Sequence, residues 1–318
     1  MTGFAGVSQH KKKSFARKYI KPYWHIYLML LPAVVVLGVF SYGPMPGILL
    51  AFKKYSAKAG IWGSQWVGLK NFNMLFQYPI FRTYLMNTVI ISCGRLFIEF
   101  PSAILVALML NEVRSSKYRR TLQTISTFPH FLSWIIVAGI MKNLLRLDGM
   151  VNAVLTATPF FDEPFRFLTS PGMFRSLLYT TNIWKEVGWS AIIYIAAISG
   201  IDEQLYEAAI IDGAGRFKQT LHVTLPGIAG TIAILFILSV GGFLNAGFDQ
   251  IFNMRNDVVE PVGNILDTYV FDMTFRSKPD YSFGAAVGLF KSAIGMALLF
   301  LADFFARKVS GRGIYSSV

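Results

Sequence analysis

The chain has 318 residues, of which 54% are hydrophobic and only 15% are charged, so it carries fewer charges than a typical soluble domain. Its net charge of +13 could indicate nucleic-acid binding, but the basic residues lie beside long apolar blocks, where they fit a membrane orientation signal better. Cys93 is the only cysteine and the four histidines lack ligand spacing, so we expect no disulfide, no metal site and no nucleic-acid partner.

Several apolar blocks are long enough to cross the bilayer core as helices, which takes about 20 residues. The first follows a basic segment, but it is too long for a signal peptide and lacks a clear cleavage site. We expect it to be a membrane helix that ends near the Gly43–Gly47 turn. Pro129 is expected to kink the third. The pattern predicts an all-α membrane protein with six transmembrane helices, at about 24–51, 83–110, 122–145, 175–200, 227–252 and 284–306.

The basic residues predict the orientation of these helices. With the N-terminus in the cytoplasm, Lys and Arg are denser on the cytoplasmic segments than on the longer outer loops. Both termini are therefore expected to be cytoplasmic. This orientation predicts a basic cytoplasmic N-terminus (1–22), a membrane domain (23–308) with a cytoplasmic loop (201–226), and a cytoplasmic tail (309–318).

The loop at 201–226 has the pattern of two short helices joined by a turn. Asp202 is a suitable N-cap for the first helix, and Gly213 and Gly215 can end it and turn the chain. An amphipathic stretch follows, and Pro226 breaks the chain before the fifth apolar block. Small residues beside a carboxylate in the first helix would let another protein approach closely, so the loop suits docking.

The spacing within this loop resembles the EAA loop of the permeases of binding-protein-dependent ABC importers. The family pattern is Glu-Ala-Ala, three residues, Gly, nine residues and Ile-x-Leu-Pro. It is matched here by Glu207-Ala208-Ala209, Gly213 and Val223-Thr224-Leu225-Pro226. The resemblance implies a coupling helix that inserts into a cleft of an ATPase subunit. The contact and turn residues that it implies are Glu207, Ala208, Ala209, Asp212, Gly213, Ala214 and Pro226.

Further segments are similar to the carbohydrate-importer permeases of the LplB type, which handle oligosaccharides or polysaccharide fragments. Three of them are Asn111-Glu112-Val113-Arg114, Phe128–Trp134 and Gly288–Ser292. This resemblance implies a type I permease fold in the cytoplasmic membrane of a bacterium. It also implies a second, related permease, a pair of ATPase subunits and an extracytoplasmic solute-binding protein as partners.

The chain contains no Gly-Lys pair and hence no phosphate-binding loop of the G-x-x-x-x-G-K-[ST] type. We therefore expect that it is not an enzyme and binds no cofactor, and that ATP and magnesium are bound by the partner ATPase.

Sugar sites combine aromatic rings with hydrogen-bonding groups, and charged groups inside membrane spans are functional candidates. On the two central spans the candidates for the substrate path are Asn182, Trp184, Lys185, Glu186, Trp189, Asn245, Phe248, Asp249 and Gln250. Trp184 and Trp189 fit interface anchors equally well.

Four further charged residues within the apolar blocks are more easily explained by structure. Arg95 and Glu99 are spaced to pair on one helix face, and we expect a structural ion pair. Lys142 and Lys291 lie near span ends, where we expect their amines to reach the membrane interface.

The basic outer loops would suit an acidic sugar such as a uronate oligomer, and loops 146–174 and 253–282 are expected to dock the binding protein. Three alternatives remain open from the residues. An ABC permease could carry amino acids, phosphate or metal instead. An ion-coupled secondary transporter would leave the 201–226 loop without a role. A membrane-embedded enzyme would need a converging catalytic set, which the spans lack.

Overall fold

The structure is a computed structural model that describes residues 23–159, 161–276 and 279–310. The predicted N-terminal segment 1–22 and the end of the predicted tail lie outside these ranges. Within them the regular secondary structure is helical, apart from one short antiparallel strand pair, β1 with β2. Segments labelled η are π-helical or 3-10 helical.

The elements up to the middle of the chain are α1 (Trp24–Leu37), η3 (Gly38–Tyr42), η4 (Met45–Phe52), β1 (Lys53–Lys54), α2 (Gly60–Gly63), β2 (Gln65–Trp66), α3 (Lys70–Gln77), α4 (Pro79–Gly94), η5 (Arg95–Glu99), α5 (Phe100–Asn111), α6 (Ser116–Thr127), η6 (Phe128–Phe131), α7 (Trp134–Leu144) and α8 (Met150–Thr156). The remaining elements are α9 (Pro171–Ile198), α10 (Glu203–Ile211), α11 (Arg216–Gln219), η7 (Thr220–Thr224), α12 (Leu225–Gly227), α13 (Ala229–Gly241), α14 (Phe248–Met254), α15 (Glu260–Gly263), α16 (Leu266–Phe271), η8 (Asp272–Arg276) and α17 (Tyr281–Ser310).

Three helices within the described ranges are long and apolar enough to cross a membrane, and five segments are if each of two bent helix pairs counts as one span. The three are Trp24–Phe52, Pro79–Asn111 and Tyr281–Ala306. The first continues past the predicted end at Gly43–Gly47, because the chain turns there into the 3-10 helix η4. Helix α9 has 28 residues, but the polar residues around Asn182 make it less apolar than the three helices above. Six spans therefore remain a prediction.

The predicted span 122–145 is broken rather than kinked at Pro129. The α6–η6 helix and α7 meet at 101°. Pro129 lies within the 3-10 helix η6, and the chain is extended at Leu132 and Ser133. The Ser133 hydroxyl then accepts a hydrogen bond from the Ile136 N–H and caps α7. The break follows from this new helix start, since an N-cap residue has non-helical dihedrals.

The predicted span 227–252 also contains two separate helices. Helix α13 ends at Gly241 after 13 residues, and α14 starts only at Phe248. Between them, Gly247 has φ +86°, a left-handed conformation that glycine adopts readily. Helix α13 is about 20 Å long at 1.5 Å per residue. It is therefore too short to cross a bilayer core of about 30 Å by itself.

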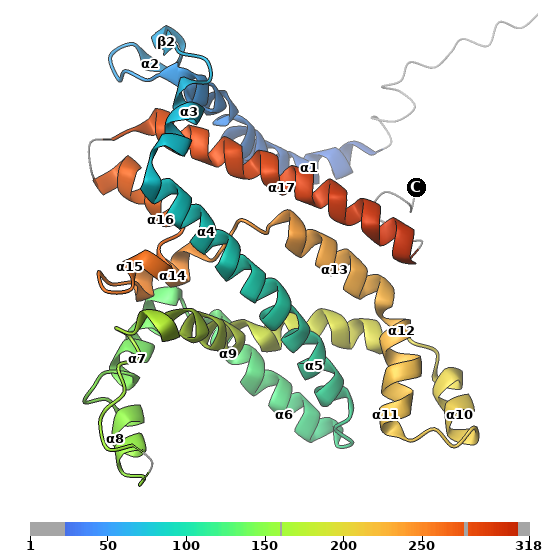
Figure 1. The fold of residues 1–318 in the computed structure, drawn as a ribbon. Coiled ribbons are helices and arrows are strands. Elements are labelled where there is room, and N and C mark those ends of the chain that lie inside the picture. The colour runs from blue at the N-terminus through green and yellow to red at the C-terminus, as the bar shows by residue number, and fades with distance from the viewer. Residues whose placement is uncertain (1–22, 160, 277–278, 311–318) are drawn as a thin grey trace, which may run out of the picture.

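The long helices pack as a fan in which α4 and α5 cross the molecule diagonally (Figure 1). Helix α5 packs on α9 through small residues, including Ala103, Ala107 and Ala191, which bring the two helices close together. Helix α17 runs beside α13 and η4. In Figure 1, α10 and α11 lie at the lower right, which we call the α10 end. Elements α2, α8 and α15 lie on the left, at the far end.

Candidate functional site

Helix α10 forms the first half of the 201–226 segment, and local interactions set both of its ends. The Asp202 carboxylate accepts a hydrogen bond of 3.0 Å from the Gln204 N–H at its start. At its end, the N–H groups of Gly213 and Ala214 donate to carbonyls of the last turn, at 3.0 and 2.8 Å. This pattern is a Schellman motif, and Gly213 has the positive φ that it needs, +76°.

The residues predicted to contact an ATPase lie on the surface of this segment. Ile211 and Phe217, beside them, are 87% and 80% exposed. Exposed apolar groups clustered in this way indicate a protein-interaction surface. Of the predicted residues, the structure leaves exposed Glu207, Ala208, Asp212, Gly213 and Pro226, and half-buries Ala209 and Ala214.

Side-chain contacts attach the segment to the bundle and hold its two halves together. Arg216 Nη1 lies 3.0 Å from a carboxylate oxygen of Glu112, just beyond the last residue of α5. The Tyr206 and Thr224 hydroxyls, 2.9 Å apart, join α10 to η7. The segment is thus connected directly to α5, although 104 residues separate Glu112 from Arg216.

A cavity of about 540 Å³ lies where α4 and α5 meet α9 and α13. We call it the central cavity. The predicted substrate-path residues on its wall are Asn182, Glu186, Trp189 and Asn245. Other polar and aromatic residues on the wall were not predicted, among them Ser92, Phe100, Ser190, Tyr194, Ser239 and Phe243.

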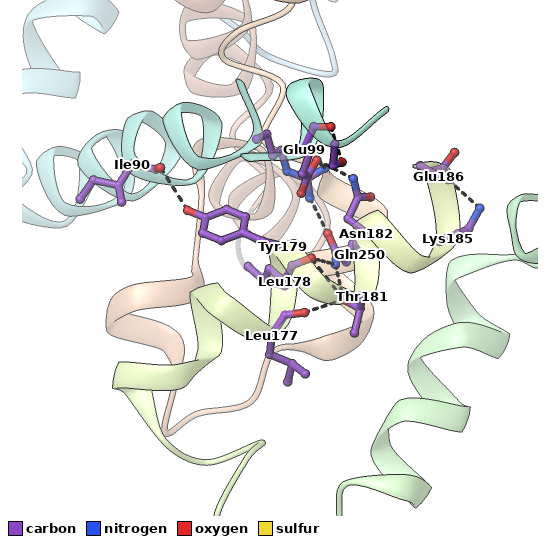
Figure 2. Close-up of polar contacts among 12 residues, drawn as sticks. Ile90, Glu99, Leu177, Leu178, Tyr179, Thr181, Asn182, Lys185, Glu186 and Gln250 are labelled. Carbon is purple, nitrogen blue, oxygen red and sulfur yellow. Dashed lines mark hydrogen bonds and ion pairs between the residues drawn. The ribbon is translucent and has the colours of Figure 1, made fainter. Parts of the chain in front are cut away.

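Arg95 and Glu99 lie on the wall of this cavity and form the expected ion pair at 3.7 Å. The pair extends to two other helices. Asn182 Nδ2 of α9 donates to Glu99 Oε2 at 2.6 Å (Figure 2), and Arg95 Nη2 donates to Gln250 Oε1 of α14. Gly247 is required here, because a Cβ atom at that position would meet the Arg95 guanidinium. The network fixes the charged groups in place.

Three buried polar atoms on the wall lack hydrogen-bond partners: Ser92 Oγ, Arg95 Nε and Glu99 Oε1. Buried polar atoms are normally paired, because an unpaired one costs about 1–3 kcal/mol. The same wall carries Asn245, Ser190 and Ser239, whose polar groups can donate and accept hydrogen bonds, so the cavity suits a ligand that does both.

A second polar cluster lies beside the cavity. Glu186 is 2.6 Å from His130 Nδ1 and 2.7 Å from Lys185 Nζ, which also donates to the His130 carbonyl at 2.7 Å. The Trp189 ring stacks on the His130 imidazole with centroids 4.4 Å apart. This cluster holds η6, at the break before α7, against α9.

The other predicted substrate-path residues do not line the cavity. Lys185 is 5% exposed and belongs to the polar cluster described above, while Trp184 is 43% exposed. Asp249 is exposed, and Phe248 packs on the rings of its own region. Gln250 is 1% exposed, and its Nε2 donates to the Leu178 carbonyl and the Thr181 hydroxyl (Figure 2). It therefore joins α14 to α9.

The expectation that Lys291 reaches the membrane interface is wrong. Its amine is paired with Asp267 of α16 and lies 3.4 Å from Asn245 Oδ1. Its side chain is 12% exposed. The pair lies beside a second cavity, of about 460 Å³, that shares Gly242 and Asn245 with the central cavity.

Ser92, Arg95 and Glu99 stand at i, i+3 and i+7, a spacing that could have placed Ser92 on the same helix face as the pair. The sequence did not indicate η5, a π-helical segment that shifts the residues after it around the helix axis. Such segments are often found at functional sites. The spacing of an ideal α-helix cannot locate them.

Residues 99–311 match the family model for the binding-protein-dependent transport system inner membrane component. Protein LplB of Bacillus subtilis (strain 168) is 42% identical over 291 residues, which cover 91% of each chain. The polygalacturonan/rhamnogalacturonan transport system permease protein YteP of the same organism is 42% identical over 308 residues, covering 96% of this chain and 95% of YteP.

A solved structure is also similar over the whole fold. It is a chain of a bacterial alginate ABC transporter in complex with a periplasmic protein bound to alginate pentasaccharide, with a TM-score of 0.85 and 34% identity. The match covers 95% of this chain and 100% of that one. With the family match, it confirms the resemblance given by the 201–226 segment. The chain belongs to the family of binding-protein-dependent transport system inner membrane components, the permease subunits of ABC importers.

Proposed function

We propose that the chain is the transmembrane permease subunit of an ATP-driven importer for oligosaccharides or polysaccharide fragments, including uronate-containing ones. It carries them across the cytoplasmic membrane by alternating access. The observation that carries this proposal is the central cavity, whose wall combines the polar residues Arg95, Glu99 and Asn245 with the aromatic residues Phe100 and Trp189.

The groups on the cavity wall suit a sugar. Each sugar hydroxyl can donate and accept a hydrogen bond, which matches the polar side chains of Asn245, Ser190 and Ser239 on the wall. Trp189, Phe100 and Tyr194 add aromatic rings for the apolar faces of sugar rings. The volume of about 540 Å³ lies within the usual range of small-molecule sites. The names of the relatives, which refer to polygalacturonan, rhamnogalacturonan and alginate, support the same class of cargo.

The 201–226 segment supports energy coupling to a partner. Its exposed Glu207 and Ile211 would enter a cleft of an ATPase subunit that binds ATP and magnesium. Closure of an ATPase pair would then move α10, and through Glu112 the end of α5. A second, related permease completes the membrane pore in this proposal, and a solute-binding protein delivers the sugar at the far end.

The test is ATP hydrolysis by the complete complex in proteoliposomes, with the binding protein added together with a panel of oligosaccharides, amino acids and phosphate. We expect stimulation by oligosaccharides alone. Stimulation by amino acids or phosphate, with none by sugars, would refute the proposed cargo.

The role of the 201–226 segment needs its own variant. Glu207→Lys should abolish the stimulation, while Glu203→Lys is a matched control in the first turn of the same exposed helix. Equal activity of both variants and the wild type would show that α10 is not the coupling element.

A further inference from the structure

A third cavity lies at the far end, between the starts of α4 and α9. Its volume is about 570 Å³. Arg82 of α4 and Arg175 of α9 both line it, with Gln77, Thr83 and the aromatic residues Phe76 and Tyr78. We call it the arginine cavity.

Neither arginine forms an ion pair with a carboxylate in the part of the chain that the structure describes. Arg175 is held by neutral acceptors: its Nη2 donates to Asn87 Oδ1 at 2.9 Å and its Nε to the Val262 carbonyl at 3.3 Å. Asn87 is itself 3% exposed and donates to the carbonyls of Pro261 and Asn264. Arg175 is thus fixed in position while its charge stays uncompensated.

The charges of the central cavity are arranged differently. There Arg95 is paired with Glu99, and Glu186 with Lys185. These paired groups create no net attraction for an anion, and the carboxylates favour hydroxyl groups instead. The attraction for an anion is therefore found in the arginine cavity, at the far end from α10.

We propose that the arginine cavity is an entry site that binds the carboxylate of a uronate residue in the incoming oligosaccharide. This inference rests on the proposed function. A guanidinium can bind a carboxylate through two parallel hydrogen bonds. Phe76 and Tyr78 offer faces on which the sugar ring packs, and Gln77 and Thr83 offer partners for its hydroxyls. The site thus distinguishes acidic from neutral sugars before they reach the central cavity.

The experiment compares uptake of trigalacturonate and of neutral galactotriose by the complete complex in phosphatidylcholine vesicles. We expect Arg82→Gln to raise the half-saturating concentration of trigalacturonate about tenfold, the effect of losing one charge-assisted hydrogen bond. The maximal rate, and both values for galactotriose, should stay the same. Arg82 is exposed, and its side chain takes part in none of the ion pairs among the described residues, so this variant should fold.

Two further variants sharpen the result. Arg175→Gln should act in the same direction, with some loss of stability because the Asn87 side-chain oxygen loses the hydrogen bond that Arg175 donates to it. Arg119→Gln is the matched control, because Arg119 is an exposed arginine of α6 that lines neither the arginine cavity nor the central cavity. It should leave both sugars unaffected.

Several outcomes would overturn the inference. They are an equal shift for both sugars, no shift for either, or wild-type uptake of galactotriose alone. A lipid phosphate bound in the cavity would make the variants differ from wild type only in vesicles that contain phosphatidylglycerol, and equally for both sugars. If wild type takes up neither sugar, the proposed function itself fails.

Discussion

The side-chain amide of Asn182 donates a hydrogen bond of 2.6 Å to the carboxylate of Glu99, across 83 residues of sequence. Asn182 is 8% exposed, and the Glu99 side chain is 13% exposed. The contact joins the π-helical segment η5 to the middle of α9. Because Glu99 lines the central cavity, Asn182 helps to hold its carboxylate in position on the cavity wall.

Replacing Asn182 with leucine should therefore destabilise the permease. The buried Glu99 carboxylate would lose a donor, which costs about 1–3 kcal/mol. Denaturant unfolding of the purified subunit in micelles measures the change. The control is Asn253→Leu, because the Asn253 amide donates only to the Asp249 carbonyl of its own helix. A similar loss for both variants would argue against a special role of the Asn182 contact.

The end of α10 offers a comparison of two neighbouring glycines. A Cβ atom would meet nothing within 4 Å at either Gly213 or Gly215. However, φ is +76° at Gly213 and −69° at Gly215. Gly213→Ala should thus cost about 1–2 kcal/mol through the backbone alone.

We expect Gly213→Ala to weaken binding of the ATPase subunit by roughly five- to thirty-fold, because this is the change in population that such an energy produces. Gly215→Ala should bind like wild type. Titration of the ATPase subunit onto the permease pair in nanodiscs provides the measurement. Tight binding by the Gly213 variant would mean that the shape of this turn does not matter for docking.

The ion pair between Arg216 and Glu112 connects the 201–226 segment to α5. Both side chains are about half exposed, so the pair contributes little stability, about 0–1 kcal/mol. Its expected role is transmission of movement. Glu112→Arg should reduce sugar-stimulated ATP hydrolysis without changing the unstimulated rate.

The charge-reversed double variant Glu112→Arg with Arg216→Glu should recover most of that stimulation. High salt should weaken stimulation in the wild type more than in a Glu112→Gln variant, because salt screens exposed pairs. A double variant no better than the single ones would exclude this pair as the link.

Helices α6 and α9 approach closely at Gly188. A Cβ atom there would collide with the main chain at Ser126 and Thr127, which cannot move aside as a flexible side chain can. Gly188→Ala should lower stability by about 1–3 kcal/mol, as overpacking does. Gly139→Ala in α7 is the control, because nothing lies within 4 Å of its added Cβ. Melting temperatures of the two variants should differ clearly, and equal values would contradict the close approach.

The sequence was most informative where local interactions decide the structure. The limits of α10 follow from Asp202 and Gly213, whose capping roles depend only on neighbouring residues. The sequence also indicated the 28-residue helix α9. Its polar residues Asn182 and Glu186, which were predicted for the substrate path, line the central cavity.

Tertiary packing decides what the sequence could not indicate. Gln250 was predicted to contact the substrate, but its side-chain amide donates a hydrogen bond to α9 and accepts one from Arg95. These partners lie on other helices, so no pattern along one helix can show them. The end of α13 at Gly241 was hidden because the apolar block continues across it. Lys291 was assigned to the interface because its partner, Asp267, lies on another helix.

The continuity of α5 has a consequence for how far a signal has to travel. The 12 residues from Phe100 to Asn111 form a rod about 18 Å long, at 1.5 Å of rise per residue. Glu99 precedes its first residue and Glu112 follows its last. If Glu112 is displaced, α5 tilts as one rigid body, and the cavity wall at Glu99 moves with it. No series of side-chain rearrangements is needed between the two ends. Stiffness of this single helix, rather than the strength of any contact along it, sets how faithfully the two ends move together.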